Sequence, residues 1–249
     1  MLISSKQNDI IKYANSIKEP KYSKKYGECF VESEKVVNEL VGRNIVSTIL
    51  VDENKTDKYK YILNVFKGKV YEITESISNY LTESVTSSGI FAFVKIPNNT
   101  SVVGDRILVL DNLQDPSNLG AIIRSAMAFN FKSIIMISGV YPYSAKVIRS
   151  SMGYVFDINL ISYNTTQLID FLQKNKYNLV SADMSGVDLK GFKAQYPLAL
   201  VIGNEGNGVS SELKQLSKHV VKIPMDNNVE SLNASVSASI IMYKLSLGE

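Results

Sequence analysis

The sequence predicts an α/β fold whose second half is an open parallel sheet with helices on both sides. Three observations predict it. Six short apolar segments lie between residues 106 and 225, and segments with apolar residues at helical spacing alternate with them. The apolar runs are nearly continuous, which is typical of strands buried on both faces of a parallel sheet. Strands and helices that alternate in this way form one sheet covered by helices.

The first hundred residues show a separate and smaller alternation. Strands are expected at residues 28–33, 47–53, 69–74 and 89–96, and helices at 34–41, 57–66 and 76–81. The stretch "KIPNNTSVVGD" at 95–105 collects Pro, Asn, Thr, Ser and Gly, which is typical of a linker. We therefore expect a small α/β domain at 1–96, a linker at 97–105 and a larger α/β domain at 106–249.

The larger domain has its strands at residues 106–113, 133–138, 156–162, 178–184, 198–203 and 219–225. Its helices are expected at 119–129, 144–152, 165–175, 209–217 and 231–247. In open parallel sheets, ligands bind beyond the carboxyl ends of the strands. The loops that follow the strands are therefore the places in which to look for a site.

Composition restricts the class of protein more than the function. The 249 residues are 45% apolar and 20% charged, as in ordinary globular proteins. The single cysteine, Cys29, excludes an intramolecular disulfide and suits a reducing compartment. The start resembles no signal peptide and no apolar run approaches the length of a membrane span, so we expect a cytoplasmic protein.

Charge is informative only in its distribution. A formal net charge of +3 is too small to indicate nucleic-acid binding, but residues 1–26 collect six lysines and three tyrosines against two acids. Lysines interleaved with tyrosines suit a phosphate backbone with unpaired bases. A solvated lysine-rich helix and turn explains the same stretch equally well.

The first strand-end loop is "LDNLQDPSNLGAIIRSAMAF", in which Gly120 is expected to open a helix. Asn118 is well placed to cap that helix, which is a common structural role. Arg124 stands in an otherwise apolar helix. We expect its guanidinium either to point into a cleft or to form a structural ion pair with an acid.

The second loop is "GNEGNG" at 203–208, which follows a fully apolar strand. Glycines at a strand end let a ligand approach the backbone closely. The spacing G-x-x-G-x-G differs from the dinucleotide fingerprint and follows a late strand, which disfavours a nicotinamide enzyme. An ordinary glycine-rich turn would leave Glu205 without an explanation.

The third loop is "IPMDNNVESLNASVSAS", and the last helix is expected to begin near Ser231. Ser and Asn are good helix caps, so capping is again the structural alternative. Within the helix, Ala234, Ala238, Ile241 and Leu245 share one face. That small-residue face is either ordinary core or a dimer contact.

Taken together, the segments "DPSNLGAIIRSA", "LVIGNEGNGVS" and "IPM…VESLNASVSA" resemble the three signature motifs of the SpoU (TrmH) family of RNA methyltransferases, in the SPOUT class. The stretch "KVIRSSMGYVFDI" also resembles the family between the first two motifs. The resemblance covers residues 106–247. Residues 1–96 more loosely resemble the small ribosomal-protein-like domain with which many members recognise RNA.

The resemblance implies transfer of a methyl group from S-adenosylmethionine to a ribose 2′-hydroxyl of structured RNA. It also implies a deep trefoil knot at the C-terminal end of the sheet, a homodimer whose sites are completed by the partner, and no metal. Ribosomal RNA is favoured over transfer RNA, because the added N-terminal domain resembles that of members that modify rRNA. A tRNA 2′-O-methyltransferase and a non-catalytic RNA-binding or ribosome-assembly protein remain the alternatives.

The resemblance also assigns residues. The motif positions that it implies to be catalytic are Asn118, Arg124, Glu205, Ser231 and Asn233. The cofactor bed falls on Ala182, Gly203, Ile223, Met225 and Leu232. We expect Arg124 to grip the target phosphate, because arginine is effectively always protonated and is a poor base. Ser231, Asn233, Glu205 or water would then share the movement of the proton.

Overall fold

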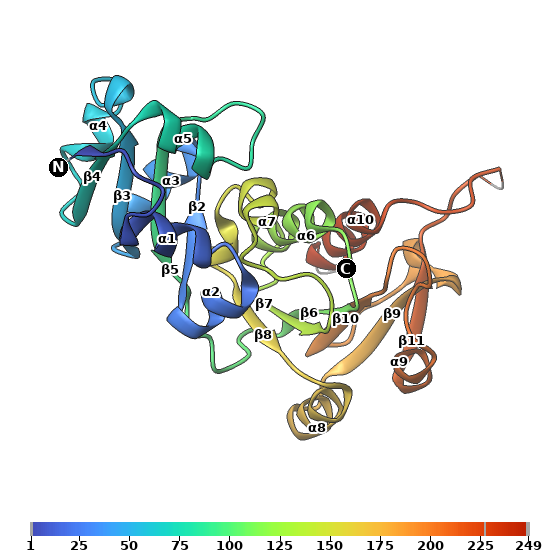
Figure 1. The fold of residues 1–249 in the computed structure, drawn as a ribbon. Coiled ribbons are helices and arrows are strands. Elements are labelled where there is room, and N and C mark those ends of the chain that lie inside the picture. The colour runs from blue at the N-terminus through green and yellow to red at the C-terminus, as the bar shows by residue number, and fades with distance from the viewer. Residues whose placement is uncertain (1, 227, 248–249) are drawn as a thin grey trace. The chain divides into compact units, whose positions relative to one another are not determined.

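The computed structural model describes residues 2–226 and 228–247, and the chain divides into two compact units (Figure 1). The first unit contains residues 1–98 and 141–156, and the second contains residues 99–140 and 157–249. The division near residue 98 lies within the stretch 97–105 that the sequence predicts as a linker. Residues 141–156 differ from the prediction, which places them in the larger domain.

The first unit is built on a mixed five-stranded sheet in the order β1-β4-β3-β5-β2. β1 and β3 pair parallel to β4, whereas β5 pairs antiparallel to β3 and β2. Its strands are β1 (Leu2–Ile3), β2 (Glu28–Val31), β3 (Val46–Asp52), β4 (Lys69–Ile73) and β5 (Ile90–Lys95). Its helices are α1 (Asp9–Ser16), α2 (Pro20–Tyr26), α3 (Glu34–Val41), α4 (Lys60–Leu63), α5 (Glu75–Leu81) and α7 (Ala145–Ser150), with 3-10 turns η1 (Glu53–Lys55) and η2 (Tyr154–Phe156).

The core of the first unit explains why its helices lie on the sheet. Ile11 of α1 and Leu81 of α5 are buried in one cluster with Leu50 and Phe91 from the strands. Strand side chains alternate between faces, so the buried Ile49 belongs to the opposite face of the sheet. Each such fully buried side chain contributes about 1.5–3 kcal/mol to the stability of the fold, because its apolar surface is removed from water.

The segment 141–156 belongs to the first unit through specific contacts. The Tyr141 hydroxyl donates to Ser23 Oγ (2.8 Å), Arg149 forms an ion pair with Glu32, and the Tyr143 ring is buried. Sequence periodicity indicates that such a segment is buried but not which neighbour buries it. The prediction therefore placed it with its neighbours in the chain.

The second unit contains a six-stranded sheet in the order β11-β9-β10-β6-β7-β8, and every neighbouring pair is parallel. This confirms the predicted α/β fold with a parallel sheet. Its strands are β6 (Arg106–Asp111), β7 (Ser133–Ile137), β8 (Asn159–Ser162), β9 (Asn178–Asp188), β10 (Leu198–Ile202) and β11 (His219–Lys222). Its helices are α6 (Pro116–Ala128), α8 (Thr165–Asn175), α9 (Ser211–Leu216) and α10 (Ala234–Ser246), with the 3-10 turn η3 (Leu189–Gly191).

Helices cover both faces of the parallel sheet. Figure 1 shows α8 and α9 on one side and α6 and α10 on the other. Leu168 of α8 and Leu213 of α9 pack with Val109 and Val201 of the central strands. Because β9, β10 and β6 are parallel neighbours, their carboxyl ends lie at the same edge of the sheet. The loops that carry the predicted site residues follow this edge.

The start of each site helix differs from the prediction because a different residue caps it. α6 begins at Pro116, since the Asp115 side chain accepts from the N–H of Ser117 at 2.7 Å. α10 begins at Ala234 rather than near Ser231, since the Asn233 side chain accepts from the N–H of Ser235 at 2.8 Å. A cap satisfies the unpaired N–H groups of the first turn, so its position sets the start of the helix.

Candidate active site

A cavity of about 690 Å³ lies in the second unit, at the carboxyl ends of β9 and β10 and beside the loop after β11. All the residues that the sequence assigns to the cofactor bed line it, namely Ala182, Gly203, Ile223, Met225 and Leu232. Glu205, Ser231 and Asn233 line it as well. Residues of the second and third sequence motifs therefore meet at one cavity, although Ala182 and Asn233 are 51 positions apart in the chain.

The loop after β10 is closed by its own backbone. Asn204 and Gly208 exchange two backbone hydrogen bonds of 3.0 and 2.9 Å, and Gly208 has a positive φ of 68°. A Cβ on Gly203 would lie 2.1 Å from the carbonyl carbon of Gly208. Glycine is thus required at position 203 by the close approach of the backbone. The loop presents Glu205 at its tip.

Glu205 is held by hydrogen bonds from the first loop. Its carboxylate accepts from the backbone N–H groups of Gln114 (3.1 Å) and Asp115 (3.0 Å) and from Asn118 Nδ2 (3.0 Å). Burial raises the pKa of this carboxyl, but the hydrogen bonds, led by that of Asn118, outweigh the burial and lower it. Glu205 is therefore a charged acceptor at neutral pH.

Asn118 joins the three loops. While its amide nitrogen donates to Glu205, its Oδ1 accepts from Asn233 Nδ2 at 2.9 Å. Asn118 is buried in the first turn of α6, and Asp115 caps that helix instead. Capping of α6 by Asn118, the structural alternative for this residue, is therefore wrong. Its side chain is used for contacts between loops.

Arg124 neither lines the cavity nor forms an ion pair with a described residue, which were the two positions expected for it from the sequence. It lies on the exposed side of α6. The buried positions of α6 include Ile122, Ile123 and Ala126, and helical periodicity places Arg124 on the opposite side of the helix. The guanidinium is therefore available to a ligand rather than to an internal acid.

The two remaining motif residues precede α10. Ser231 is exposed, lines the cavity and has no hydrogen bond with a described residue. Leu232 is half-buried and lines the same wall. Asn233 both caps α10 and reaches Asn118. The three consecutive residues thus present a hydroxyl, an apolar side chain and an amide to the site.

Sequence reasoning missed the charged pair Asp183 and Lys214. Asp183 lines the cavity, pairs with Lys214 Nζ at 2.5 Å, and accepts from the hydroxyl of Ser185 at 2.7 Å. These contacts, led by the hydrogen bond from Lys214, lower the pKa of Asp183 to about 2. The signal that could have found Asp183 is its place directly after Ala182 in β9.

Within residues 2–226 and 228–247, no group of three or more His, Cys, Asp or Glu side chains is placed to hold a metal ion. In the same part of the chain, no helix is long and apolar enough to cross a bilayer.

Relatives by sequence are RNA methyltransferases. Residues 105–243 match the SpoU rRNA Methylase family. The chain is 28% identical over 247 residues to the 23S rRNA (guanosine(2553)-2′-O)-methyltransferase RlmP of Bacillus subtilis (strain 168), with 98% of each chain covered. It is 32% identical over 194 residues to an uncharacterized tRNA/rRNA methyltransferase of Archaeoglobus fulgidus, covering 77% of this chain and 87% of that protein.

Solved structures share the fold over the whole chain. An RNA 2′-O ribose methyltransferase has a TM-score of 0.85 at 25% identity, and the match covers 100% of this chain and 99% of that one. The SpoU methyltransferase AviRb from Streptomyces viridochromogenes, solved in complex with AdoMet, has a TM-score of 0.87 at 23% identity, with 97% of each chain covered. Both units of this chain are therefore present in structures of this kind.

Proposed function

This chain belongs to the SpoU rRNA methylase family, and on that basis we propose that it transfers a methyl group from S-adenosylmethionine to a ribose 2′-hydroxyl of RNA. The hydrogen-bonded chain from Glu205 through Asn118 to Asn233 carries this proposal. It joins the three family motifs beside a cavity large enough for the cofactor, since ligand pockets commonly measure about 300–1,000 Å³.

The residues that line the cavity suit S-adenosylmethionine. When bound, this cofactor supplies a methyl group on a positively charged sulfonium, which is already activated for attack. Ile223 and Leu232 offer apolar walls for an adenine, and the strand ends offer backbone N–H and C=O groups. Asp183 is paired with Lys214, which leaves Glu205 and Glu230 on the cavity lining against one ammonium group, that of Lys222. This excess of negative charge favours a cationic ligand.

Glu205 is assigned a positioning role rather than that of a base. Both of its carboxylate oxygens are engaged by hydrogen bonds, and its lowered pKa disfavours protonation. The amide of Asn233 has no basic nitrogen. Ser231, which lines the cavity and makes no hydrogen bond with a described residue, or a water molecule is left to accept the hydrogen bond of the ribose hydroxyl and to relay its proton to the solvent.

Arg124 is proposed to grip a phosphate of the target RNA. Its exposed guanidinium has no acidic partner among the described residues, and its planar fork can bind a phosphate through two parallel hydrogen bonds. Arg124→Lys keeps the charge and loses the fork. We expect kcat/KM to fall about tenfold, in line with the loss of one charge-assisted hydrogen bond. Near-normal turnover of this variant would contradict the assigned role.

Methyl labelling tests the function directly. The protein is incubated with methyl-labelled S-adenosylmethionine and total RNA, precursor rRNA or stripped ribosomal subunits. We expect label at one linkage that resists alkaline hydrolysis, because a methylated 2′-oxygen cannot attack the neighbouring phosphate. Label on a base would assign another acceptor. The absence of label from every RNA would support a non-catalytic RNA-binding protein.

Ribosomal RNA is the proposed substrate class, ahead of transfer RNA. The relative from Bacillus subtilis is named for 23S rRNA, and its match includes the first unit as well as the second. We infer a cytoplasmic location on the same ground. Within the labelling experiment, stronger labelling of tRNA than of rRNA would reverse the order of the two substrates.

A homodimer is proposed through α6 and α10, but not through the small-residue face of α10. Ala238, Ile241 and Leu245 are buried within the second unit, so the small-residue face of α10 is core. The opposite face of α10 exposes Ile240 and Tyr243, which are 38% and 54% exposed. An exposed apolar stripe of this kind is typical of a contact with another chain.

We infer that the C-terminal end of the sheet forms a trefoil knot and that residues 1–96 recognise RNA, with 97–105 as linker and 106–249 as methyltransferase domain. The full-length similarity to an RNA 2′-O ribose methyltransferase supports these inferences. The packing of residues 141–156 with the first unit supports extending the RNA-binding part to include them.

A further inference from the structure

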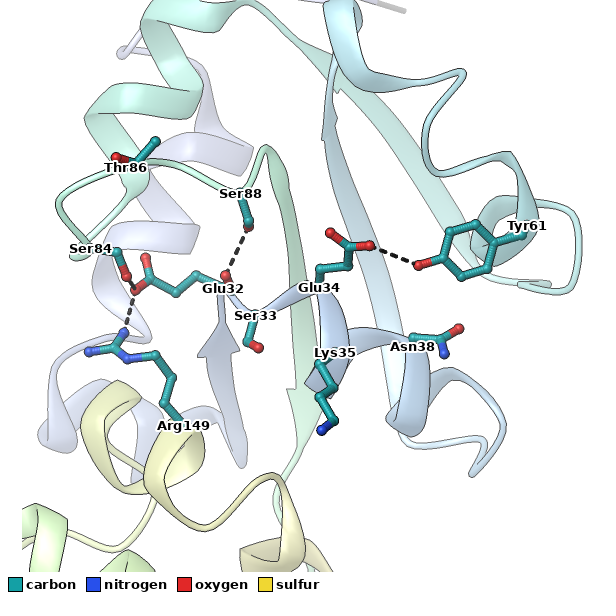
Figure 2. Close-up of a pocket in the computed structure, with 10 residues that line it drawn as sticks. All are labelled: Glu32, Ser33, Glu34, Lys35, Asn38, Tyr61, Ser84, Thr86, Ser88 and Arg149. Carbon is teal, nitrogen blue, oxygen red and sulfur yellow. Dashed lines mark hydrogen bonds and ion pairs between the residues drawn. The ribbon is translucent and has the colours of Figure 1, made fainter.

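A second cavity lies wholly within the first unit and is not used by the methyl-transfer site. It measures about 540 Å³ and is lined from the start of α3, the loop 82–89, α4 and α7. Figure 2 shows Tyr61 and Asn38 at one end and Arg149 with Ser84 at the other, with Lys35 between them. The size is that of a pocket for one small polar ligand.

At the Arg149 end of the pocket, both carboxylate oxygens of Glu32 accept hydrogen bonds. Glu32 is buried, forms an ion pair with Arg149, and accepts from the hydroxyl groups of Thr82 (3.0 Å) and Ser84 (2.6 Å). It also accepts from the backbone N–H of Glu83 at 2.7 Å. Glu32 therefore organises the pocket wall and does not repel an anionic ligand.

The other carboxylate, Glu34, is neutralised in the same way. Lys58 Nζ lies 2.7 Å from Glu34 Oε2, and the hydroxyl group of Tyr61 donates to Oε1 at 3.0 Å. The hydrogen bond from Lys58, followed by that from Tyr61, lowers the pKa of Glu34 despite an opposing effect of burial. Because Tyr61 is tied at its hydroxyl, its ring is oriented while 50% of the residue stays exposed.

Three polar side chains that line the pocket have no hydrogen bond or ion pair with a described residue. They are the ammonium of Lys35, the amide of Asn38 and the hydroxyl of Thr86. With both carboxylates paired, Lys35 is the uncompensated charge of the lining. The pocket thus offers a cation, an amide, a free hydroxyl and an oriented aromatic ring.

We propose that this pocket binds one unpaired nucleotide of the RNA substrate, with its base against Tyr61, its edge near Asn38 and Thr86, and its phosphate near Lys35. This inference rests on the proposed action on RNA. Unpaired bases are recognised by stacking on aromatic rings and by hydrogen bonds to their edges, while lysines contact the backbone. A paired base would have its faces stacked and its edge occupied.

Loss of the ring tests the stacking contact. Binding of the full chain to a labelled single-stranded oligoribonucleotide is measured for Tyr61→Ala and Tyr61→Phe. We expect about tenfold weaker binding for the alanine variant, as for the loss of one stacked base. The phenylalanine variant is expected to lose less, because it keeps the ring and loses only the hydroxyl bond to Glu34 that orients it. Tyr80→Ala removes an exposed tyrosine outside the pocket and is the matched control. Equal effects at positions 61 and 80 would overturn the site.

Salt dependence tests the phosphate contact independently. Lys35→Ala is expected to reduce the slope of log affinity against log salt by about 0.7, the value for one contact with a single-stranded phosphate. Lys69→Ala, at another exposed lysine of the first unit, is expected to leave the slope unchanged. Tyr61→Ala should weaken binding without changing the slope. An unchanged slope for Lys35→Ala would overturn the assigned phosphate contact.

Three further results test this inference, and the last two separate it from its premise. Binding of a free nucleoside monophosphate as tightly as the oligoribonucleotide would overturn it in favour of a small-molecule site. If the unaltered protein methylates RNA and Tyr61→Ala binds RNA normally, the pocket assignment fails and the proposed function stands. If the unaltered protein never transfers a methyl group but Tyr61→Ala and Lys35→Ala still weaken RNA binding as expected, the proposed function alone fails.

Discussion

Asn118 links the motif loops of the candidate active site through its two amide atoms. Its nitrogen is bonded to Glu205 and its oxygen to Asn233, and the side chain is buried. A buried amide fixed from both ends cannot rotate without leaving a polar group unpaired, which costs about 1–3 kcal/mol. The geometry of the three loops therefore depends on this residue.

We predict that Asn118→Ala lowers kcat about tenfold to a hundredfold and changes the affinity for S-adenosylmethionine much less. The reason is that Asn118 does not line the cofactor cavity but positions two residues that do. Single-turnover methylation and calorimetric binding measure the two effects. Asn175→Ala removes an exposed asparagine of α8 and serves as control. A loss of cofactor binding equal to the loss of rate would contradict a positioning role.

The contact of Asp183 with Lys214 makes the free energy of unfolding depend on pH in the acidic range. The folded pKa of Asp183, about 2, lies below the value of about 3.9 expected for an unfolded aspartate. A depressed folded pKa contributes stability that is present above about pH 4 and is lost as the pH falls towards 2. Asp183→Asn removes this contribution at neutral pH.

We therefore predict that Asp183→Asn is less stable than the unaltered protein at pH 7, and that the difference narrows between about pH 4 and pH 2. The urea midpoint, measured at several pH values, gives this comparison. Asp170→Asn changes an exposed aspartate of α8 that has no ion pair among the described residues. A difference that stays constant across this pH range would count against the Lys214 contact as its source.

At the scale of elements, α10 presents apolar side chains on two faces. One face packs in the second unit, and Ser125 Oγ and Ser239 Oγ lie 2.7 Å apart where α6 meets α10. The other face exposes Ile240 and Tyr243, and the Tyr243 ring lies 5.7 Å from that of Phe129. Exposed apolar side chains on one face of a helix are typical of a contact with another chain, which is the basis of the proposed dimer.

We predict that Ile240→Glu converts a dimer into a monomer, because a charge on the exposed face of α10 would be desolvated in the contact. Sedimentation equilibrium measures the change in mass. Leu216→Glu introduces the same charge at an exposed leucine of α9 and is expected to leave the dimer intact. A monomeric unaltered protein, or a dimer that survives Ile240→Glu, would refute this interface.

At the scale of the whole molecule, each unit holds its own cavity. The second unit has the candidate cofactor cavity and the first has the polar pocket, and no residue is shared between their linings. A ligand that binds only folded protein stabilises it, by about 2.7 kcal/mol at a hundred times its dissociation constant. Cofactor binding is therefore measurable as a change in the stability of the second unit.

We predict that S-adenosylmethionine raises the unfolding temperature of the protein and that NAD does not. The loop after β10 lacks the glycine spacing of a dinucleotide site, and its backbone closes on itself at Gly203 and Gly208. Differential scanning calorimetry with each ligand gives the comparison. A shift with NAD of the same size would reopen the nicotinamide alternative.

The sequence by itself determined the alternation of strands and helices, because apolar periodicity reports directly on burial. The helix at 165–175 and the central strands of the parallel sheet were predicted within a few residues for this reason. It also identified the motif residues, because the resemblance to the SpoU family depends on the order of these motifs along the chain. Helix starts were less well predicted, since Asp115 and Asn233 cap the helices where Asn118 and Ser231 were expected to begin them.

Only the tertiary structure decided which of these residues meet. Asn118 and Asn233 are 115 positions apart, and their hydrogen bond depends on how two strand-end loops are brought together by the sheet. The same holds for the pairing of Asp183 with Lys214, for the exposure of Arg124, and for the packing of residues 141–156 with the first unit. Local patterns record whether a side chain is buried, whereas its partner is chosen by contacts between segments distant in the chain.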